Sequence, residues 1–176
     1  MNNHGYVSLT SVEAWNCDAL NRAGVYTTAD LDNGVMVVCS AIAKDASNNI
    51  TGYHFAVAPA TSSSVHCWIV NTPEVGSELE MQTYSDPRYF YNKAGKPMSI
   101  KYLKPHVDCI EVDKNTFASG ALPTTQGFVT ITTGGKFLAA ASAPETDVTY
   151  FSVLGFKEVA VGDEMMDVVV LQCENN

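Results

Sequence analysis

The 176-residue sequence has little charge, and positive charge is the scarcer kind. Charged residues make up 16% of it, against about 25% in an ordinary soluble domain, whereas apolar residues make up 46%. A disordered chain would show the opposite balance. The 10 Lys and Arg stand against 19 Asp and Glu, and the net charge of −9 argues against nucleic acid as a partner, because phosphates repel an acidic surface. A weakly charged polar surface favours close packing against other proteins.

Signals for export and membrane insertion are also missing. Residues 1–5 are polar and lack the basic start and apolar core of a signal peptide. No apolar run approaches the roughly 18 to 20 residues that span a bilayer, so we expect no membrane partner. The cysteines are widely separated, odd in number and without a C-x-x-C pair, which predicts buried free thiols in a reducing cytoplasm. They are Cys17, Cys39, Cys67, Cys109 and Cys173.

Catalytic and metal-binding motifs are equally scarce. The sequence has no nucleophile elbow, phosphate loop or dinucleotide fingerprint. Zinc could use His66-Cys67 and His106-x-x-Cys109, but neighbours on a strand point to opposite faces, and His106 with Cys109 supplies only two ligands. The alternating pattern around Cys109 predicts a packed side chain rather than a nucleophile. We therefore expect no enzyme activity, no cofactor, no metal and no small-molecule substrate.

The residues that are plentiful indicate a β protein. Val and Thr, which suit the pleated sheet, number 20 and 15. Short apolar or alternating runs recur between turn-forming residues, and Gly134-Gly135 is a strong hairpin signal. The pattern predicts a mainly β fold, built as a single antiparallel β-sandwich or barrel-like domain. The expected strands are 24–28, 34–41, 51–57, 65–71, 98–104, 107–112, 127–132, 136–141, 149–160 and 164–174.

Two short segments have helical signals. Thr10 and Glu13 have the spacing of a capping box ahead of residues 14–20, which predicts a short helix near the N-terminus. A second short helix is expected near 86–92, with Pro87 at its start and Gly95 after its end. The expected organisation is an N-terminal arm or short helix over 1–23, followed by a β-rich domain over 24–176. Residues 1–9 could order on contact with a partner.

The most unusual local feature is a basic, aromatic segment over residues 88–104. It holds five of the ten positive charges and no acid, so it carries +5, and the rest of the chain must carry −14 to give the net charge of −9. Aromatic residues and Arg are enriched in interfaces, and opposite charges steer docking. The segment is therefore a candidate protein interface for an acidic surface, such as residues 145–174 of another copy. A solvated face with buried aromatics is the alternative, and nucleic-acid stacking is the weakest one. The candidate interface residues are Arg88, Tyr89, Tyr91, Lys93, Lys96, Lys101, Tyr102 and Lys104.

A family resemblance begins in this segment. The run 89–97, then Lys101-Tyr102-Leu103, then 107–112, resembles small structural proteins of tailed bacteriophages, above all the capsid decoration proteins, also called head auxiliary or cement proteins. Residues 30–37 are similar to the early strands of such chains. The resemblance implies a β-rich virion protein that is made in the host bacterial cytoplasm. Its expected role is to bind the outside of an icosahedral head shell in many copies and stabilise it, without catalysis or cofactor. Its expected partners are the major capsid protein and copies of itself.

Other functions stay open at this stage. The chain could be another virion component, such as a head fibre or tail protein. It could also be a soluble carbohydrate-binding β-domain that uses Trp15, Trp68 or its tyrosines. A cysteine-dependent hydrolase built on Cys67 or Cys109 is the alternative among enzymes.

Overall fold

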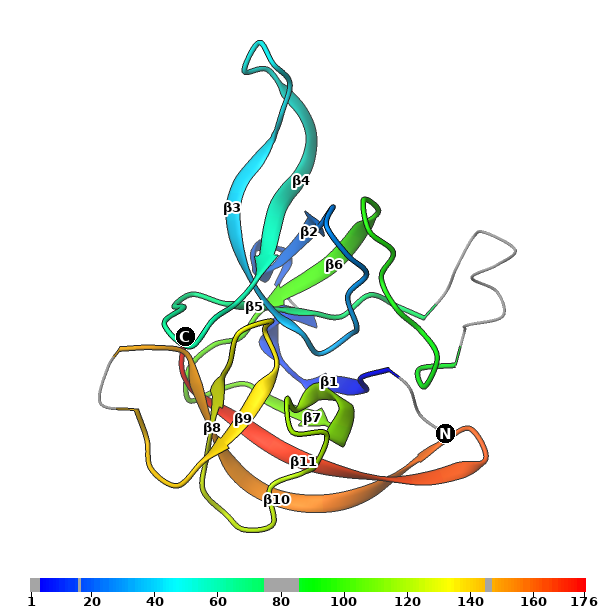
Figure 1. The fold of residues 1–176 in the computed structure, drawn as a ribbon, viewed down its shortest axis with the longest axis vertical. Coiled ribbons are helices and arrows are strands. Elements are labelled where there is room, and N and C mark those ends of the chain that lie inside the picture. Colours follow the sequence, from blue (N-terminus) through cyan, green and yellow to red (C-terminus); the bar gives the residue numbers. More distant parts are fainter. Residues whose placement is uncertain (1–3, 16, 75–85, 145–146) are drawn as a thin grey trace.

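The computed structural model describes residues 4–15, 17–74, 86–144 and 147–176, and strands dominate these ranges (Figure 1). Three short 3-10 turns accompany the strands: η1 (Glu13–Trp15), η2 (Asp18–Leu20) and η3 (Lys114–Thr116). The strands are β1 (Val7–Ser11), β2 (Asn21–Val25), β3 (Met36–Lys44), β4 (Ile50–Pro59), β5 (Trp68–Val70), β6 (Pro97–Tyr102), β7 (Cys109–Val112), β8 (Phe128–Ile131), β9 (Phe137–Ala140), β10 (Tyr150–Val161) and β11 (Glu164–Asn175).

The strands form two sheets, one open and one closed. The open sheet has six strands in the order β1-β7-β11-β10-β8-β9, and the other five strands close into the barrel β2-β4-β3-β5-β6. The mainly β prediction is confirmed, and each of the ten predicted strands overlaps an observed one. The expectation of wholly antiparallel pairing is wrong at one place, because β2 runs parallel to β4 where it closes the barrel against β6.

One hydrophobic core joins the sheet to the barrel. It contains Phe137, Phe151 and Leu171 from the sheet together with Met36 and Ile69 from the barrel. Burial of alternate side chains along these strands explains why the Val-rich segments become strands rather than helices. A second, smaller cluster fills the barrel itself. Its buried members are Leu31, Val35, Val37, Val57, Val70, Met98 and Ile100.

The N-terminal segment does not form the expected helix. Thr10 belongs to β1, which pairs with β7 at the edge of the six-stranded sheet, and the turn after it is the three-residue η1. The backbone amide of Glu13 donates to a carboxylate oxygen of Asp108 at 2.8 Å, and the Glu13 carboxylate pairs with Lys104 at 2.6 Å. Thr10 and Glu13 therefore do not cap a helix, because Thr10 lies in a strand and Glu13 contacts Asp108 and Lys104. The expected boundary at residue 24 falls inside β2, and residues 1–3 and 16 of the expected arm lie outside the described residues.

The helix expected near 86–92 is not confirmed. The backbone amides of Tyr89 and Phe90 both donate to the carbonyl of Asp86, which makes a single turn. Phe90 is buried, and Asn92 then forms an isolated antiparallel bridge with Leu31, so its backbone is extended. Among the described residues no helix reaches two full turns. The bridge to Leu31 stops the turn from propagating.

Two long hairpins set the shape of the molecule. The β3–β4 hairpin projects from the barrel at one end of the long axis, and the β10–β11 hairpin lies at the other end (Figure 1). The distal part of the first hairpin, residues 40–54, is called the arm below. At its turn the Asp45 carboxylate accepts hydrogen bonds from the backbone amides of Ser47 and Asn49, each at 2.9 Å. These bonds and the one from the Asn49 side chain lower the pKa of Asp45.

Backbone contacts at Gly135 fasten the sheet to the barrel. The predicted turn at Gly134 and Gly135 is confirmed between β8 and β9, and both residues have positive φ, 93° and 74°. The Gly135 carbonyl accepts from the Met36 amide at 2.8 Å, and the Gly135 amide donates to Ala60 at 2.9 Å. A Cβ on Gly135 would lie 2.1 Å from the Met36 carbonyl oxygen. Only glycine permits this approach.

Candidate interaction site

The basic, aromatic segment meets the acidic C-terminal stretch within one chain. The Arg88 guanidinium pairs with Asp86 at 2.5 Å, with Asp163 at 3.2 Å and with Glu164 at 3.1 Å, and the Arg88 side chain is only 12% exposed. The hydrogen bond with Arg88 lowers the pKa of Asp86, and the same bond raises the pKa of Arg88. The guanidinium also lies 2.9 Å from where a Cβ on Gly162 would be. Arg88 thereby holds the β10–β11 turn against the turn at 86–89.

The two lysines at the end of the segment, Lys101 and Lys104, also make contacts within the chain. Lys101 lies on β6, is only 5% exposed and has a pKa lowered by burial. Its ammonium donates to the Ser99 hydroxyl at 3.2 Å. Lys104 pairs with Glu13, and the hydrogen bond to that carboxylate raises the pKa of Lys104. Lys101 is therefore removed from the surface, and Lys104, which is partly exposed, is paired with an acid of the same chain.

The tyrosines of the segment pack within the protein. The Tyr89 ring lies 5.8 Å from the Arg88 guanidinium, and the Tyr91 ring stacks on His4 at 5.4 Å. The Tyr102 ring meets Trp68 edge to face at 5.5 Å, and its hydroxyl donates to the Asn176 carbonyl at 3.0 Å. Trp68 also lies under the Arg22 guanidinium at 5.3 Å, so it is not an open platform for a sugar. The side chain of Trp15 lies outside the described residues.

The remaining two members of the predicted interface are exposed together. Lys93 and Lys96 lie on the loop before β6, and both side chains face solvent. The loop is held in shape because the amide of Ala94 donates to the Asp30 carboxylate at 2.9 Å and the amide of Gly95 donates to the Tyr26 carbonyl at 2.7 Å. The structure therefore does not gather the eight residues into one patch. A contact of Lys93 and Lys96 with a partner stays a prediction.

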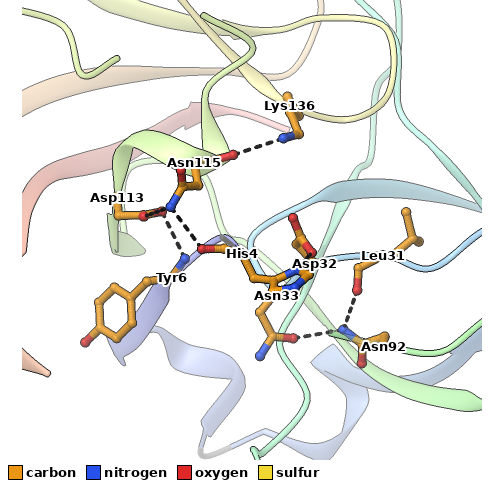
Figure 2. Close-up of polar contacts among 9 residues, drawn as sticks. All are labelled: His4, Tyr6, Leu31, Asp32, Asn33, Asn92, Asp113, Asn115 and Lys136. Carbon is orange, nitrogen blue, oxygen red and sulfur yellow. Dashed lines mark hydrogen bonds and ion pairs between the residues drawn. The ribbon is translucent and has the colours of Figure 1, made fainter. Parts of the chain in front are cut away.

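A buried polar cluster joins the N-terminal segment to three distant loops (Figure 2). The His4 ring bonds the Asp32 carboxylate at 2.7 Å, and the His4 carbonyl accepts from the Asn115 side-chain amide at 3.1 Å. Asp113, almost fully buried, accepts from the Tyr6 backbone amide at 2.9 Å. Burial raises the pKa of Asp113 above its ordinary value.

A second part of the cluster lies next to His4. The Asn92 side-chain amide donates to the Asn33 side-chain oxygen and to the Leu31 carbonyl, each at 3.1 Å. In the part of the chain that the structure describes, every buried side-chain nitrogen and oxygen has a hydrogen-bond partner. The cluster therefore holds loops together and directs no unused polar group at a ligand. Sequence reasoning missed it because its partners lie up to 111 residues apart.

The histidines and cysteines considered for chemistry are separated. The His66 ring is 3.4 Å from the Tyr102 hydroxyl, whereas His106 bonds Glu174 at 3.1 Å. Burial raises the pKa of both Cys67 and Cys109, which keeps these thiols protonated rather than as nucleophilic thiolates. Within residues 4–15, 17–74, 86–144 and 147–176, no three His, Cys, Asp or Glu side chains are grouped to hold a metal ion.

A cavity that sequence reasoning did not anticipate lies beside the β10–β11 hairpin. Its volume is about 510 Å3, and it lies between the hairpin and the segment 113–122. The only local feature of the sequence that indicates this cavity is the pair Met165-Met166 between acidic residues. Its lining mixes apolar side chains such as Leu122 and Val161 with charged ones such as Arg88 and Asp167. The lining residues are Arg88, Asp113, Lys114, Gly120, Ala121, Leu122, Val161, Glu164, Met165, Met166 and Asp167.

Comparison of the chain with protein-family models, with curated proteins and with solved structures finds no match. A search of the described residues for a helix long and apolar enough to cross a membrane finds none. The function is therefore argued from the residues and their arrangement.

Proposed function

We propose that the protein is a bacteriophage virion structural protein that binds the outside of the head shell as a capsid decoration protein. The observation that carries this proposal is the pair of long hairpins at opposite ends of the molecule (Figure 1), each of which has exposed apolar side chains. The arm exposes Ile50 and Tyr53, and the β10–β11 hairpin exposes Leu154, Phe156 and Met165. Exposed large apolar side chains of this kind are available for contact with another protein.

The proposal also explains the shortage of charge. A shell-binding protein must bury on the order of 1,000 Å2 or more with its neighbours, and burying uncompensated charge costs far more than burying neutral polar groups. The resemblance of residues 89–112 to phage decoration proteins supports the same role. The proposed partners are the major capsid protein and copies of this chain, and the exposed Lys93 and Lys96 would meet an acidic surface on one of them.

Two measurements test the proposal. Mass spectrometry of purified particles should find this chain at a copy number comparable to that of the shell protein. A low copy number in particles would assign the chain to another virion position, such as a fibre or tail, and its absence from particles would overturn the proposal.

A pair of substitutions tests the basic loop. Joint Lys93→Glu and Lys96→Glu should abolish binding to shells that lack the protein, because both side chains are exposed and their charge is reversed. The melting temperature of the variant, measured beside the binding, separates lost contact from lost folding. Ser62→Glu with Thr133→Glu adds acidic groups at other exposed positions and is the control. Unchanged binding of the lysine pair would show that the loop is only a solvated face.

A further inference from the structure

Four large side chains meet at one end of the barrel. Along β4, β5 and β6, exposure rises from the buried Val57, Val70 and Ile100 to a half-buried residue two positions away, which shares the same face of its strand. On β2 this inner face carries Gly24, whose Cβ would meet Val57 and Ile100, and also Arg22, two residues before it. The residues that meet here, called the barrel end below, are Arg22, Phe55, Trp68 and Tyr102.

The Arg22 guanidinium lies over the aromatic rings of the barrel end. Its central carbon is 4.5 Å from the centre of the Phe55 ring and 5.3 Å from the centre of the Trp68 ring. Tyr102 in turn meets Trp68 edge to face at 5.5 Å. This end is the one from which the arm projects, since Phe55 directly follows the arm on β4 (Figure 1). A cation above a ring uses a face of the guanidinium, whereas its N–H donors lie in the plane and remain available to an acceptor.

Arg22 has no acid of its own. Its side chain is exposed, and within the described ranges of the chain no oxygen forms an ion pair with it or accepts a hydrogen bond from it. Arg88, the other arginine of the sequence, pairs with three carboxylates. The chain has 19 acidic residues against 10 basic ones, so a shortage of acids does not explain why Arg22 lacks one.

A single carboxylate fits this arrangement. The planar fork of a guanidinium gives a carboxylate two parallel N–H···O bonds. The rings on one side of Arg22 keep water from that side and lower the local dielectric, which strengthens the pair. A nucleic acid presents a phosphate at every nucleotide and is bound through several cations, which a net charge of −9 opposes. Arg, Trp and Tyr are, in addition, the residue types that contribute most to contacts between proteins.

We propose that the barrel end is a binding site for a protein partner that places one carboxylate, flanked by neutral side chains, on Arg22. The carboxylate takes the donors of the guanidinium, and the flanking side chains lie on the exposed parts of Trp68 and Tyr102. The inference depends on barrel residues alone and holds whether or not the chain binds a head shell.

Fluorescence anisotropy of a short peptide tests the site. The probe is an end-blocked peptide with one glutamate between two leucines and an uncharged dye, and its partner probe has glutamine in place of glutamate. The glutamate peptide should bind the wild type at least about tenfold more tightly, since a hydrogen bond to a charged group is the stronger kind. Arg22→Gln should remove this preference. Arg22→Lys keeps a cation but not the planar fork, so it should keep only part of it.

Lys114→Gln is the matched control, because Lys114 on η3 is an exposed cation outside the barrel and its replacement changes the net charge equally. Its affinity for the glutamate peptide should equal that of the wild type. Circular dichroism of each variant separates lost contact from lost folding, and Arg22→Lys, which keeps a cation above the rings, serves if Arg22→Gln does not fold.

Four results would overturn the proposal. They are equal binding of the two peptides by the wild type, wild-type binding by either Arg22 variant, an equal loss in Lys114→Gln, and tighter binding of a short oligothymidylate than of the glutamate peptide, which would indicate a nucleic-acid site. The assay contains no shell, so its failure is separate from failure to find the chain in particles.

Discussion

The attachment of the sheet to the barrel should depend on the absence of a side chain at Gly135. Replacement by alanine places a methyl group 2.1 Å from the Met36 carbonyl oxygen and 2.8 Å from a Val35 methyl carbon. The Met36 oxygen belongs to the backbone and cannot rotate away. The β8–β9 turn must then withdraw, and the hydrogen bonds of Gly135 with Met36 and Ala60 are lost.

Gly134 is a matched control beside it. It also has a positive φ, but a Cβ there meets nothing within 4 Å. Gly134→Ala should therefore lose only the cost of placing an L-residue in the left-handed region, about 1 to 2 kcal/mol. Gly135→Ala has that cost, about 1 kcal/mol for each of two hydrogen bonds and about 1 to 3 kcal/mol of packing strain. The expected loss is roughly 4 to 7 kcal/mol, which is a large part of the stability of an ordinary domain.

Urea unfolding followed by tryptophan fluorescence measures both losses. Gly134→Ala should shift the midpoint moderately, and Gly135→Ala should shift it much further or yield a protein that is unfolded without urea. Losses that agree within about 1 kcal/mol, less than the hydrogen-bond contribution alone, would refute the close backbone contact between the turn and the barrel.

Two other predictions concern buried polar groups. The Asn176 side chain accepts from the Cys67 backbone amide at 2.7 Å and donates to the Leu103 carbonyl at 2.9 Å. Asn176→Ala leaves both groups unpaired and should lower the free energy of unfolding, measured in urea, by about 3 kcal/mol. A loss under about 1 kcal/mol would contradict this. Burial raises the pKa of Asp113. The contribution of Asp113 to the stability of the folded state is therefore complete below pH 3.8, its ordinary pKa, and is lost as the pH rises through the raised pKa. The stability of the wild type relative to Asp113→Asn should therefore fall as pH rises above 3.8, and a pH-independent difference would contradict this.

The strands could be predicted because their signals are local. Runs of Val and Thr between turn-forming residues are visible within windows of ten residues, and the turn at Gly134 and Gly135 was found in this way. β1 was missed although Val7 and Leu9 show the alternation of a strand, because the capping-box spacing of Thr10 and Glu13 indicated a helix beside it. That spacing had no effect once Asp108, distant in sequence, bonded the Glu13 amide.

Which strands pair, and whether a charged side chain is buried, paired or exposed, depends on residues that are distant in the sequence. Nothing near β2 indicates that it closes the barrel by running parallel to β4. Lys101 follows the buried Ile100 on β6, and a simple alternation would turn it to solvent, but Lys101 is buried as well, and its ammonium donates to the Asn71 carbonyl and the Ser99 hydroxyl. Arg88 finds two of its partners at Asp163 and Glu164, which no local pattern connects to it.

These internal pairs change what the uneven charge of the sequence means. Part of the attraction between the basic segment and the acidic C-terminal stretch operates within one chain, since Arg88 pairs with Asp163 and Glu164 of the β10–β11 turn. Lys157 similarly pairs with Glu111 at 2.5 Å. A partner therefore meets a less polar molecule than the sequence suggests, with exposed cations on the loop of Lys93 and Lys96. The proposed association would then depend mainly on apolar contact, for which the exposed Tyr53 of the arm is available, with charge acting mainly to orient the approach.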